Sequence, residues 1–202
     1  IFAFSYLRYA RYVSPIHHTR CELEDILEIL KVNIDFQKQF IGEYQGYHFS
    51  GWKKKFIPHF VNFPDTKFTF KYSFQLRSKQ PVIAWGKHAR SLKKKYFPHV
   101  VTVEDGFIRS RGLGANLVRP YSLVFDPIGI YYDATCTSKL ELILNQIQLT
   151  ADQQKRVSVL KDALIQLNIT KYNIGAEQKL YAPQTNRKVI LVTGQVEDDL
   201  SI

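Results

Sequence analysis

The 202-residue chain is long enough for one large domain or for one domain and part of a second, and its 45% hydrophobic and 14% aromatic residues exclude a disordered protein. Its formal net charge of +10 favours anionic partners such as nucleic acid, lipid headgroups, nucleotides or acidic sugars. No apolar run approaches the roughly 20 residues of a membrane-spanning helix. The two cysteines, Cys21 and Cys136, offer neither a disulfide framework nor a metal-ligand spacing, which favours a reducing, cytoplasmic setting.

Residues 1–20 are rich in tyrosine, phenylalanine and arginine. This mixture suits stacking on nucleic-acid bases, or the packing of a tail on a neighbouring domain. Thr19 and Glu22 then have the spacing of a capping box, and the apolar residues from Leu23 to Leu30 recur at helical spacing. The sequence therefore predicts a structural helix here.

Two stretches that lie 40 residues apart resemble each other, Gly46 to Val61 and Gly86 to Val101. Each contains a glycine, a histidine, three consecutive lysines, an aromatic residue, a Pro-His pair and a valine. Two copies are too few for a solenoid, so we interpret them as two strand–turn–helix units, each with a basic helix that a proline ends. We expect the lysine triplets to form solvated faces, with contact to a membrane surface or a polyanion as the alternative.

The second copy predicts a β-α-β unit. Residues 81–85 are typical of a short buried strand, residues 89–96 of a helix, and the β-branched run 100–103 of the next strand. This order implies a parallel sheet with a right-handed crossover. His88 then lies at the turn between strand and helix, where it is a candidate for catalysis although most single histidines are structural.

The strand at 100–103 leads into a polar loop, Glu104 to Gly114, with two carboxylates, two arginines and several glycines. Open α/β sheets bind ligands just beyond the carboxyl ends of their strands. The loop is therefore the candidate site, and the alternative is a tight turn with a surface salt bridge.

Further downstream, residues 122–125 and 130–132 flank an Asp-Pro-Ile-Gly turn, which predicts a β-hairpin. Two capping boxes follow. They predict helices that begin after Ser138, with Glu141 as its partner, and after Thr150, with Gln153.

These elements together predict an α/β fold class built on a Rossmann-like parallel sheet. We expect four parts: 1–40 as the tail of a preceding module or a linker, 41–170 as a Rossmann-like domain that carries the polar loop, 171–187 as a linker, and 188–202 as the start of a second Rossmann-like domain. The pattern stops after the first strand and glycine turn of that last part, so we expect the chain to be a piece of a longer protein.

The chain resembles the capsule polysaccharide biosynthesis family of KpsC type in four motifs: residues 104–110 (EDGFIRS), 119–124 (RPYSLV), 129–135 (GIYYDAT) and 194–199 (GQVEDD). Two departures from the family pattern are Cys136-Thr137-Ser138 in place of Arg-Pro-Ser and Leu200 in place of a small residue. The resemblance implies the first, acceptor-side half of a two-domain transferase of GT-B type, with the nucleotide-binding domain truncated.

The activity that this resemblance implies is that of a retaining β-Kdo glycosyltransferase of Gram-negative bacteria. Such an enzyme transfers Kdo from CMP-Kdo onto a (lyso)phosphatidylglycerol-linked oligo-Kdo acceptor, without a metal or another cofactor. The implied partners are the CMP-Kdo donor, the lipid-linked Kdo acceptor and capsule assembly and export proteins, with no nucleic acid. The implied location is cytoplasmic, peripheral on the inner face of the inner membrane. Because much of the nucleotide site is missing, we expect the 202 residues to be inactive by themselves.

A retaining transfer needs a nucleophile on the face of the sugar opposite the leaving nucleotide. In the analogous hydrolases the two carboxyl groups lie about 5–5.5 Å apart, whereas adjacent residues on a strand, such as Glu104 and Asp105, point to opposite sides. We expect Asp105 to be the nucleophile, because Gly106 leaves room for a sugar and because the resemblance places the nucleophile there. Glu104 would support the site, and Asp133 and His88 are candidates for acid/base or hydroxyl-binding roles.

The donor sugar carries a carboxylate, which a guanidinium binds in a bidentate manner. Arg109, Arg111 and Arg119 are therefore candidates for substrate binding, with structural pairing to Glu104 or Asp126 as the alternative.

Ser122 and Gly106 complete the expected substrate-binding group. The resemblance places Gly194, Gln195 and Asp198 at the nucleotide cleft. The alternative function is a basic polyanion- or nucleic-acid-binding module without catalysis, which explains the charge and the lysine triplets but not the acidic, glycine-rich loop. A non-catalytic scaffold that docks onto a partner or a membrane is a further alternative.

Overall fold

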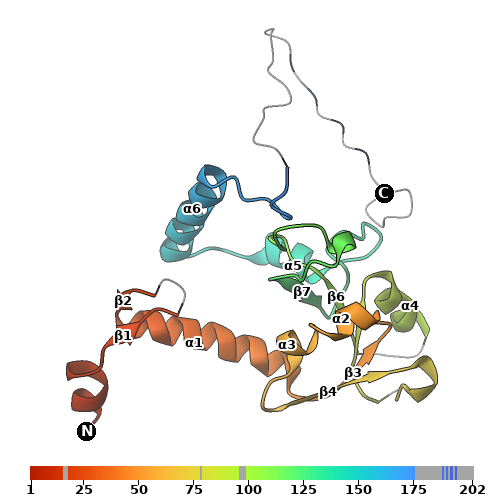
Figure 1. Cartoon of the computed structure of the whole chain (residues 1–202), viewed down its shortest axis with the longest axis horizontal. Coiled ribbons are helices and arrows are strands. Elements are labelled where there is room, and N and C mark those ends of the chain that lie inside the picture. Colours follow the sequence, from red (N-terminus) through yellow and green to blue (C-terminus); the bar gives the residue numbers. More distant parts are fainter. Residues whose placement is uncertain are drawn as a thin grey trace. The chain divides into compact units, whose positions relative to one another are not determined.

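The computed structural model describes residues 1–15, 18–77, 79–95 and 99–175, together with four single residues beyond them. They belong to two compact units (Figure 1). The first unit comprises Ile1–Tyr44 and Val61–Phe68, and the second comprises Gln45–Phe60 and the chain from Thr69 onward.

The first unit holds the π-helical turn η1 (Ala3–Arg8), the short antiparallel strands β1 (Tyr12–Val13) and β2 (Arg20–Cys21), the helix α1 (Leu23–Gln37) and the 3-10 turn η2 (Lys38–Phe40). The helix is confirmed, but its predicted capping box is wrong. The capping box is formed by Glu22 and Asp25 instead of Thr19 and Glu22. The sequence allowed both, because Asp25 follows Glu22 at the same three-residue spacing at which Glu22 follows Thr19.

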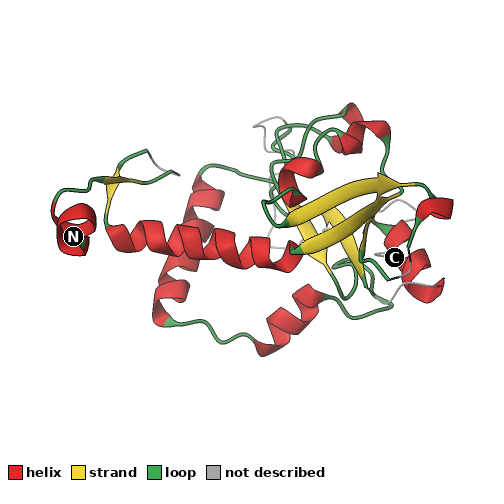
Figure 2. Ribbon diagram, turned by 90° about the horizontal axis from the view of Figure 1, so that it is seen from below, coloured by secondary structure: helices red, strands yellow, loops and turns green. Residues whose placement is uncertain are grey.

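The sheet has five strands in the order β4-β3-β5-β6-β7. Figure 2 draws the strands in yellow. Their bounds are β3 Gly42–Tyr47, β4 Thr66–Lys71, β5 Val82–Trp85, β6 Val100–Asp105 and β7 Leu123–Asp126. β5 runs parallel to β3 and to β6, and α4 (Lys87–Lys95) connects β5 to β6. The α/β fold class and the parallel β-α-β unit are therefore confirmed.

β7 pairs antiparallel with β6, and the predicted second strand of its hairpin, at residues 130–132, is a turn. Asp126, at the end of β7, accounts for the turn. Its Oδ1 accepts the N–H groups of Ile128 (2.7 Å) and Gly129 (2.9 Å), and its Oδ2 accepts that of Lys139 (2.8 Å). A carboxylate that binds three N–H groups folds the chain back toward a helix start instead of extending it into a strand.

Two capped helices follow, α5 (Lys139–Gln146) and α6 (Ala151–Gln166). Both capping boxes are confirmed. Ser138 Oγ accepts the N–H of Glu141 at 3.2 Å, and Thr150 Oγ1 accepts that of Gln153 at 3.3 Å. No helix among the described residues is both long and apolar enough to cross a membrane.

The repeated stretches form the two expected strand–turn–helix units. The first passes from β3 through His48 to the short helices α2 (Gly51–Lys54) and α3 (Pro58–Val61), and the second passes from β5 through Gly86 to α4. The expectation of solvated lysines is wrong for two of the first triplet. Lys53 Nζ lies 3.6 Å from the ring centroid of Trp85, and Lys54 Nζ lies 5.5 Å from those of Phe70 and Tyr72. The side chains of the second triplet lie outside the described residues.

The core of the second unit lies around the central strand. Val82, Ile83 and Ala84 of β5 are fully buried, as a strand covered on both faces requires. Ala84, Ala89 of α4 and Val100 of β6 pack in one buried cluster, which holds α4 against the two strands that it connects.

Ile83→Ala should lower the free energy of unfolding by about 2–5 kcal/mol, because it removes a fully buried side chain and leaves a cavity. Val159→Ala, on the exposed face of α6, is the matched control and should change it by less than about 0.5 kcal/mol. Urea denaturation of the two variants measures both values. Equal values would show that β5 is not the centre of the core.

Candidate functional site

The polar loop begins at the carboxyl end of β6, where Glu104 and Asp105 are the last two residues of the strand. They lie opposite Val124 and Leu123 of β7. The neighbouring strand β5 ends at the same edge of the sheet, followed by Gly86 and the first turn of α4. This edge is the one at which open α/β sheets bind ligands.

Both side-chain oxygens of Glu104 are occupied. Oε1 accepts a hydrogen bond from the Tyr132 hydroxyl at 3.0 Å, and Oε2 accepts the N–H of Asp105 at 3.2 Å. Burial raises the pKa of Glu104, while these hydrogen bonds and the charge of Lys53 act in the opposite direction. Glu104 thus links β6 to the 130–132 turn and supports the residue that follows it.

Gly86 leaves the space that the Glu104 carboxylate fills. A Cβ at this position would lie 2.6 Å from Glu104 Oε1, and the residue has a φ of +52°, a conformation that other residues rarely adopt. Glycine is therefore required at this turn for two independent reasons.

Asp105 forms a close ion pair with Arg109. Its Oδ2 lies 2.8 Å from Arg109 Nε, and its main-chain oxygen accepts a hydrogen bond from the Tyr131 hydroxyl at 3.0 Å. The other carboxylate oxygen, Oδ1, is buried and has no hydrogen-bond partner among the described residues. Of the four carboxylate oxygens of Glu104 and Asp105, Asp105 Oδ1 is the one for which neither a hydrogen bond nor an ion pair is formed with a described residue.

Arg109 is the largest fully buried side chain of the described chain, with 1% of its surface exposed. Its Nη1 donates to Ser110 Oγ and to the main-chain oxygen of Val118, both at 2.8 Å. A Cβ on Gly114 would lie 2.8 Å from Nη2, so that glycine makes room for the guanidinium. Arg109 therefore holds Asp105 in place and presents no free edge to a substrate carboxylate. Neither predicted structural partner, Glu104 or Asp126, is the one it pairs with.

The other two predicted arginines differ from Arg109. Arg111 and Arg119 are exposed and form no ion pair with another described residue. The buried and the exposed guanidinium groups therefore have different tasks: one orients a carboxylate, and two are accessible to an anion.

Gly106 is buried, and the space beside it is filled by Ser122. A Cβ on Gly106 would overlap Ser122 Oγ, which itself donates to the main-chain oxygen of Ile108. The expectation that this glycine opens a path for a sugar is wrong, because the loop uses the space for its own packing.

Asp133 is buried and has structural partners, while its acid/base or hydroxyl-binding role stays a prediction. Its Oδ1 accepts both the N–H (3.0 Å) and the hydroxyl (2.6 Å) of Thr135, and its Oδ2 lies 3.0 Å from Arg90 Nη1. Burial acts to raise the pKa of Asp133, but hydrogen bonds from Thr135 and Cys136 and the charge of Arg90 outweigh it, so that the pKa is lowered. An ionised carboxylate with these partners anchors the turn to α4.

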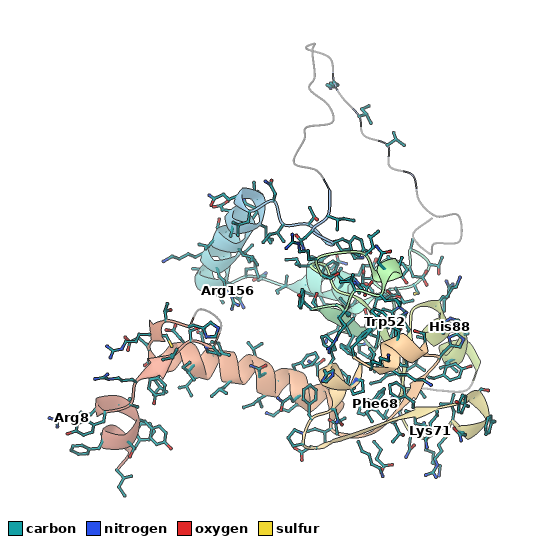
Figure 3. The ribbon with its side chains drawn as sticks, in the orientation of Figure 1. Arg8, Trp52, Phe68, Lys71, His88 and Arg156 are labelled. Carbon is teal, nitrogen blue, oxygen red and sulfur yellow. The ribbon has the colours of Figure 1, made fainter. Side chains whose placement is uncertain are left out.

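His88 stacks on His48 with the ring centroids 3.4 Å apart and the ring planes inclined by 26°. His88 lies on the first turn of α4 (Figure 3). Burial, together with His48, Lys87 and Lys53, lowers the pKa of His88, so its imidazole is neutral at pH 7. Sequence reasoning missed His48, although its position in the first repeat, equivalent to that of His88 in the second, was a usable signal.

The segment after α6 packs on the polar loop. The main-chain oxygen of Lys171 accepts the N–H groups of Arg109 (2.8 Å) and Ser110 (3.3 Å), and that of Tyr172 accepts the N–H of Gly112 at 2.7 Å. Asn173 Nδ2 donates to the main-chain oxygen of Ser110 at 3.0 Å. Residues 171–173 were expected to begin a linker, and they instead hold the loop.

The expected nucleotide-binding group is not placed by the structure. Gln195 and Asp198 lie outside the described residues, as does most of the expected strand at 188–202, and Gly194 is described only as a single residue. This group stays a prediction. The described part of the chain contains no cluster of three histidine, cysteine, aspartate or glutamate side chains suited to a metal ion.

Gly86→Ala should lower the free energy of unfolding by at least about 1 kcal/mol, because alanine is strained at a positive φ and its Cβ displaces the Glu104 carboxylate. Gly51→Ala is the matched control. A Cβ there meets no atom within 4 Å, and the residue lies in the first turn of a helix. Chemical denaturation compares the two, and a Gly86→Ala protein as stable as the control would contradict the geometry at this turn.

The chain was compared with known proteins. Residues 80–180 match the family model described as capsule polysaccharide biosynthesis protein. The capsule polysaccharide modification protein LipA of Neisseria meningitidis serogroup B is 37% identical over an alignment that covers all of this chain and 30% of LipA. The lipopolysaccharide-processing protein LpsZ of Rhizobium meliloti is 36% identical over 64% of this chain and 31% of LpsZ. The chain thus spans less than a third of these curated relatives.

Two solved structures of KpsC from Thermosulfurimonas dismutans are also similar. The β-Kdo 2,7 transferase shares 34% identity with a TM-score of 0.56, over 79% of this chain and 51% of that one. The β-Kdo 2,4 transferase shares 30% identity with a TM-score of 0.54, over 69% of this chain and 46% of that one. With the family match across the strands and loop that build the site, the chain belongs to the capsule polysaccharide biosynthesis family, of KpsC type.

Proposed function

We propose that this chain is the acceptor-side part of a retaining glycosyltransferase that transfers Kdo from CMP-Kdo onto a (lyso)phosphatidylglycerol-linked oligo-Kdo acceptor. The similar solved structures are described as β-Kdo transferases, which supports the sugar. Family membership supports a role in capsule polysaccharide biosynthesis.

One observation carries the assignment of the nucleophile. Asp105 Oδ1 is buried without a hydrogen-bond partner among the described residues, whereas both oxygens of Glu104 are engaged. An unpartnered buried oxygen lowers stability, and such atoms mark sites whose geometry serves a function. Asp105 is therefore the carboxylate available for chemistry, and Glu104 is its support.

The reaction that fits this arrangement has two displacements. Asp105 Oδ1 attacks the anomeric carbon of Kdo as the bond from that carbon to the CMP phosphate oxygen breaks, which gives a glycosyl ester and CMP. An acceptor hydroxyl then displaces the carboxylate and loses its proton to a base, so that two inversions give net retention. His88 is our candidate for that base, because its neutral imidazole can accept a proton.

The remaining groups of the proposal bind substrate. Arg111 and Arg119, being exposed, are the candidates for the donor carboxylate, and Gly194, Gln195 and Asp198 are those for the nucleotide. A lipid-linked acceptor places the enzyme at the inner face of the inner membrane, together with capsule assembly and export proteins. The polyanion-binding alternative loses support because Lys53 and Lys54 contact aromatic rings.

Asp105→Asn should reduce Kdo transfer by several orders of magnitude, because the amide keeps the shape but removes the nucleophile. The experiment uses the intact protein that carries this chain, with CMP-Kdo and acceptor. Glu104→Gln should lose activity less severely, through weaker positioning of Asp105. Asp162→Asn, an exposed change on α6, is the matched control and should leave the rate unchanged.

Mass spectrometry after mixing with donor alone separates these roles. The unmodified protein and the Asp162→Asn protein should gain the mass of one Kdo, and the Asp105→Asn protein should not. An adduct that persists in Asp105→Asn would reject Asp105 as the nucleophile.

A further inference from the structure

Two adjacent tyrosines hold two adjacent acidic residues. Tyr132 donates its hydroxyl to Glu104 Oε1, and Tyr131 donates its hydroxyl to the main-chain oxygen of Asp105, both at 3.0 Å. Their ring centroids lie 5.2 Å apart with the planes at 86°, so the two rings diverge from one turn toward two different targets. Both tyrosines lie in the motif 129–135, but neither is among the site residues predicted from the sequence.

Tyr131 is fixed from two further sides. The charge of the Lys171 ammonium acts on the phenol, and the ring centroid of Phe107 lies 5.0 Å from that of Tyr131. Burial raises the pKa of Tyr131 even though the charge of Lys171 acts in the opposite direction. The phenol therefore keeps its proton at neutral pH and remains a donor to Asp105.

Lys171 connects this contact to the other side of Asp105. Its main-chain oxygen accepts the N–H of Arg109, whose guanidinium pairs with Asp105 Oδ2. Lys171 therefore acts on Asp105 in two ways: its charge lies beside the Tyr131 phenol, which donates to the Asp105 backbone, and its main-chain oxygen holds Arg109, which pairs with the carboxylate. These contacts hold the Asp105 backbone and Oδ2 and so fix the orientation of Oδ1. Oδ1 itself has no hydrogen-bond partner among the described residues.

We propose that Tyr131, Tyr132 and Lys171 are positioning residues of the transferase, with Tyr131 and Lys171 setting the direction of Asp105 and Tyr132 setting that of Glu104. The proposal rests on the function proposed above. It goes beyond that function because it assigns two separable tasks to two neighbouring hydroxyl groups.

The two tasks predict different kinetic signatures in the intact protein. Tyr131→Phe removes a hydrogen bond to the main chain, so kcat should fall about tenfold at an unchanged KM for CMP-Kdo, and the acid limb of the pH–rate profile should stay in place. Tyr132→Phe removes a hydrogen bond that lowers the pKa of Glu104. That pKa should rise further, so Glu104 should lose its charge at a higher pH than in the unmodified protein, because its ionised form is populated only above its pKa.

Lys171→Met removes the ammonium but keeps the stem and the main-chain oxygen that Arg109 needs. It should lower kcat as Tyr131→Phe does, and the double variant should be no slower than either single variant, because both changes break one connection. Tyr9→Phe, an exposed change in the first unit, is the matched control and should change nothing. The proposal for Asp105 would be overturned if the losses of kcat in Tyr131→Phe and Lys171→Met added up in the double variant. It would also be overturned if kcat were unchanged in Tyr131→Phe.

A measurement that needs no turnover separates this proposal from the proposed function. NMR of protein labelled with carboxyl-¹³C glutamate follows the titration of Glu104, identified by its loss in Glu104→Gln. Its midpoint should be higher in Tyr132→Phe than in the unmodified protein, and an equal midpoint would reject the role of Tyr132. If the unmodified protein forms no product from CMP-Kdo, the proposed function fails, while this titration still decides whether Tyr132 sets the Glu104 carboxylate.

Discussion

The ion pair between Asp105 and Arg109 is the interaction on which the rest of the loop depends. A buried guanidinium lowers stability unless its donors are satisfied and its charge is balanced. Residues of the same loop satisfy Arg109. The oxygens of Ser110 and Val118 accept hydrogen bonds from its Nη1, and Asp105 balances its charge. Replacing Asp105 by a neutral residue would leave Arg109 buried and unbalanced, so the carboxylate serves the fold as well as the chemistry.

This demand explains residues that otherwise look unrelated. Gly114 must lack a side chain because the guanidinium occupies the space beside it, and Ser110 is buried because its hydroxyl accepts from Arg109 and donates to Gly112. Lys171 closes the arrangement through the backbone. Many of the glycine and polar residues of the loop thus serve to bury one charge, that of Arg109. The remaining polar groups of the loop are available to a substrate.

The elements that sequence reasoning predicted are those fixed by local rules. The parallel pairing of β5 and β6 follows from two apolar runs joined by a short helix, and the caps at Ser138 and Thr150 follow from contacts three residues apart. The contacts that the sequence did not predict are those between residues distant in sequence. Asp133 is engaged by Arg90, Lys53 lies on Trp85, and Lys171 binds Arg109. No spacing rule predicts such contacts, because burial decides them after the sheet has formed.

The stacked histidines show what an internal repeat does when its copies lie side by side. β3 and β5 are adjacent and parallel, and the histidine that follows β3 in the first copy stacks on the histidine that follows β5 in the second. For most side chains such like-with-like contact is harmless. For this pair it means that His48 is one of the groups that, with burial as the main cause, lower the pKa of His88. The repeat has therefore placed at this edge of the sheet a ring from one copy that weakens the hold of the other copy's His88 on a proton, a property that neither copy has alone.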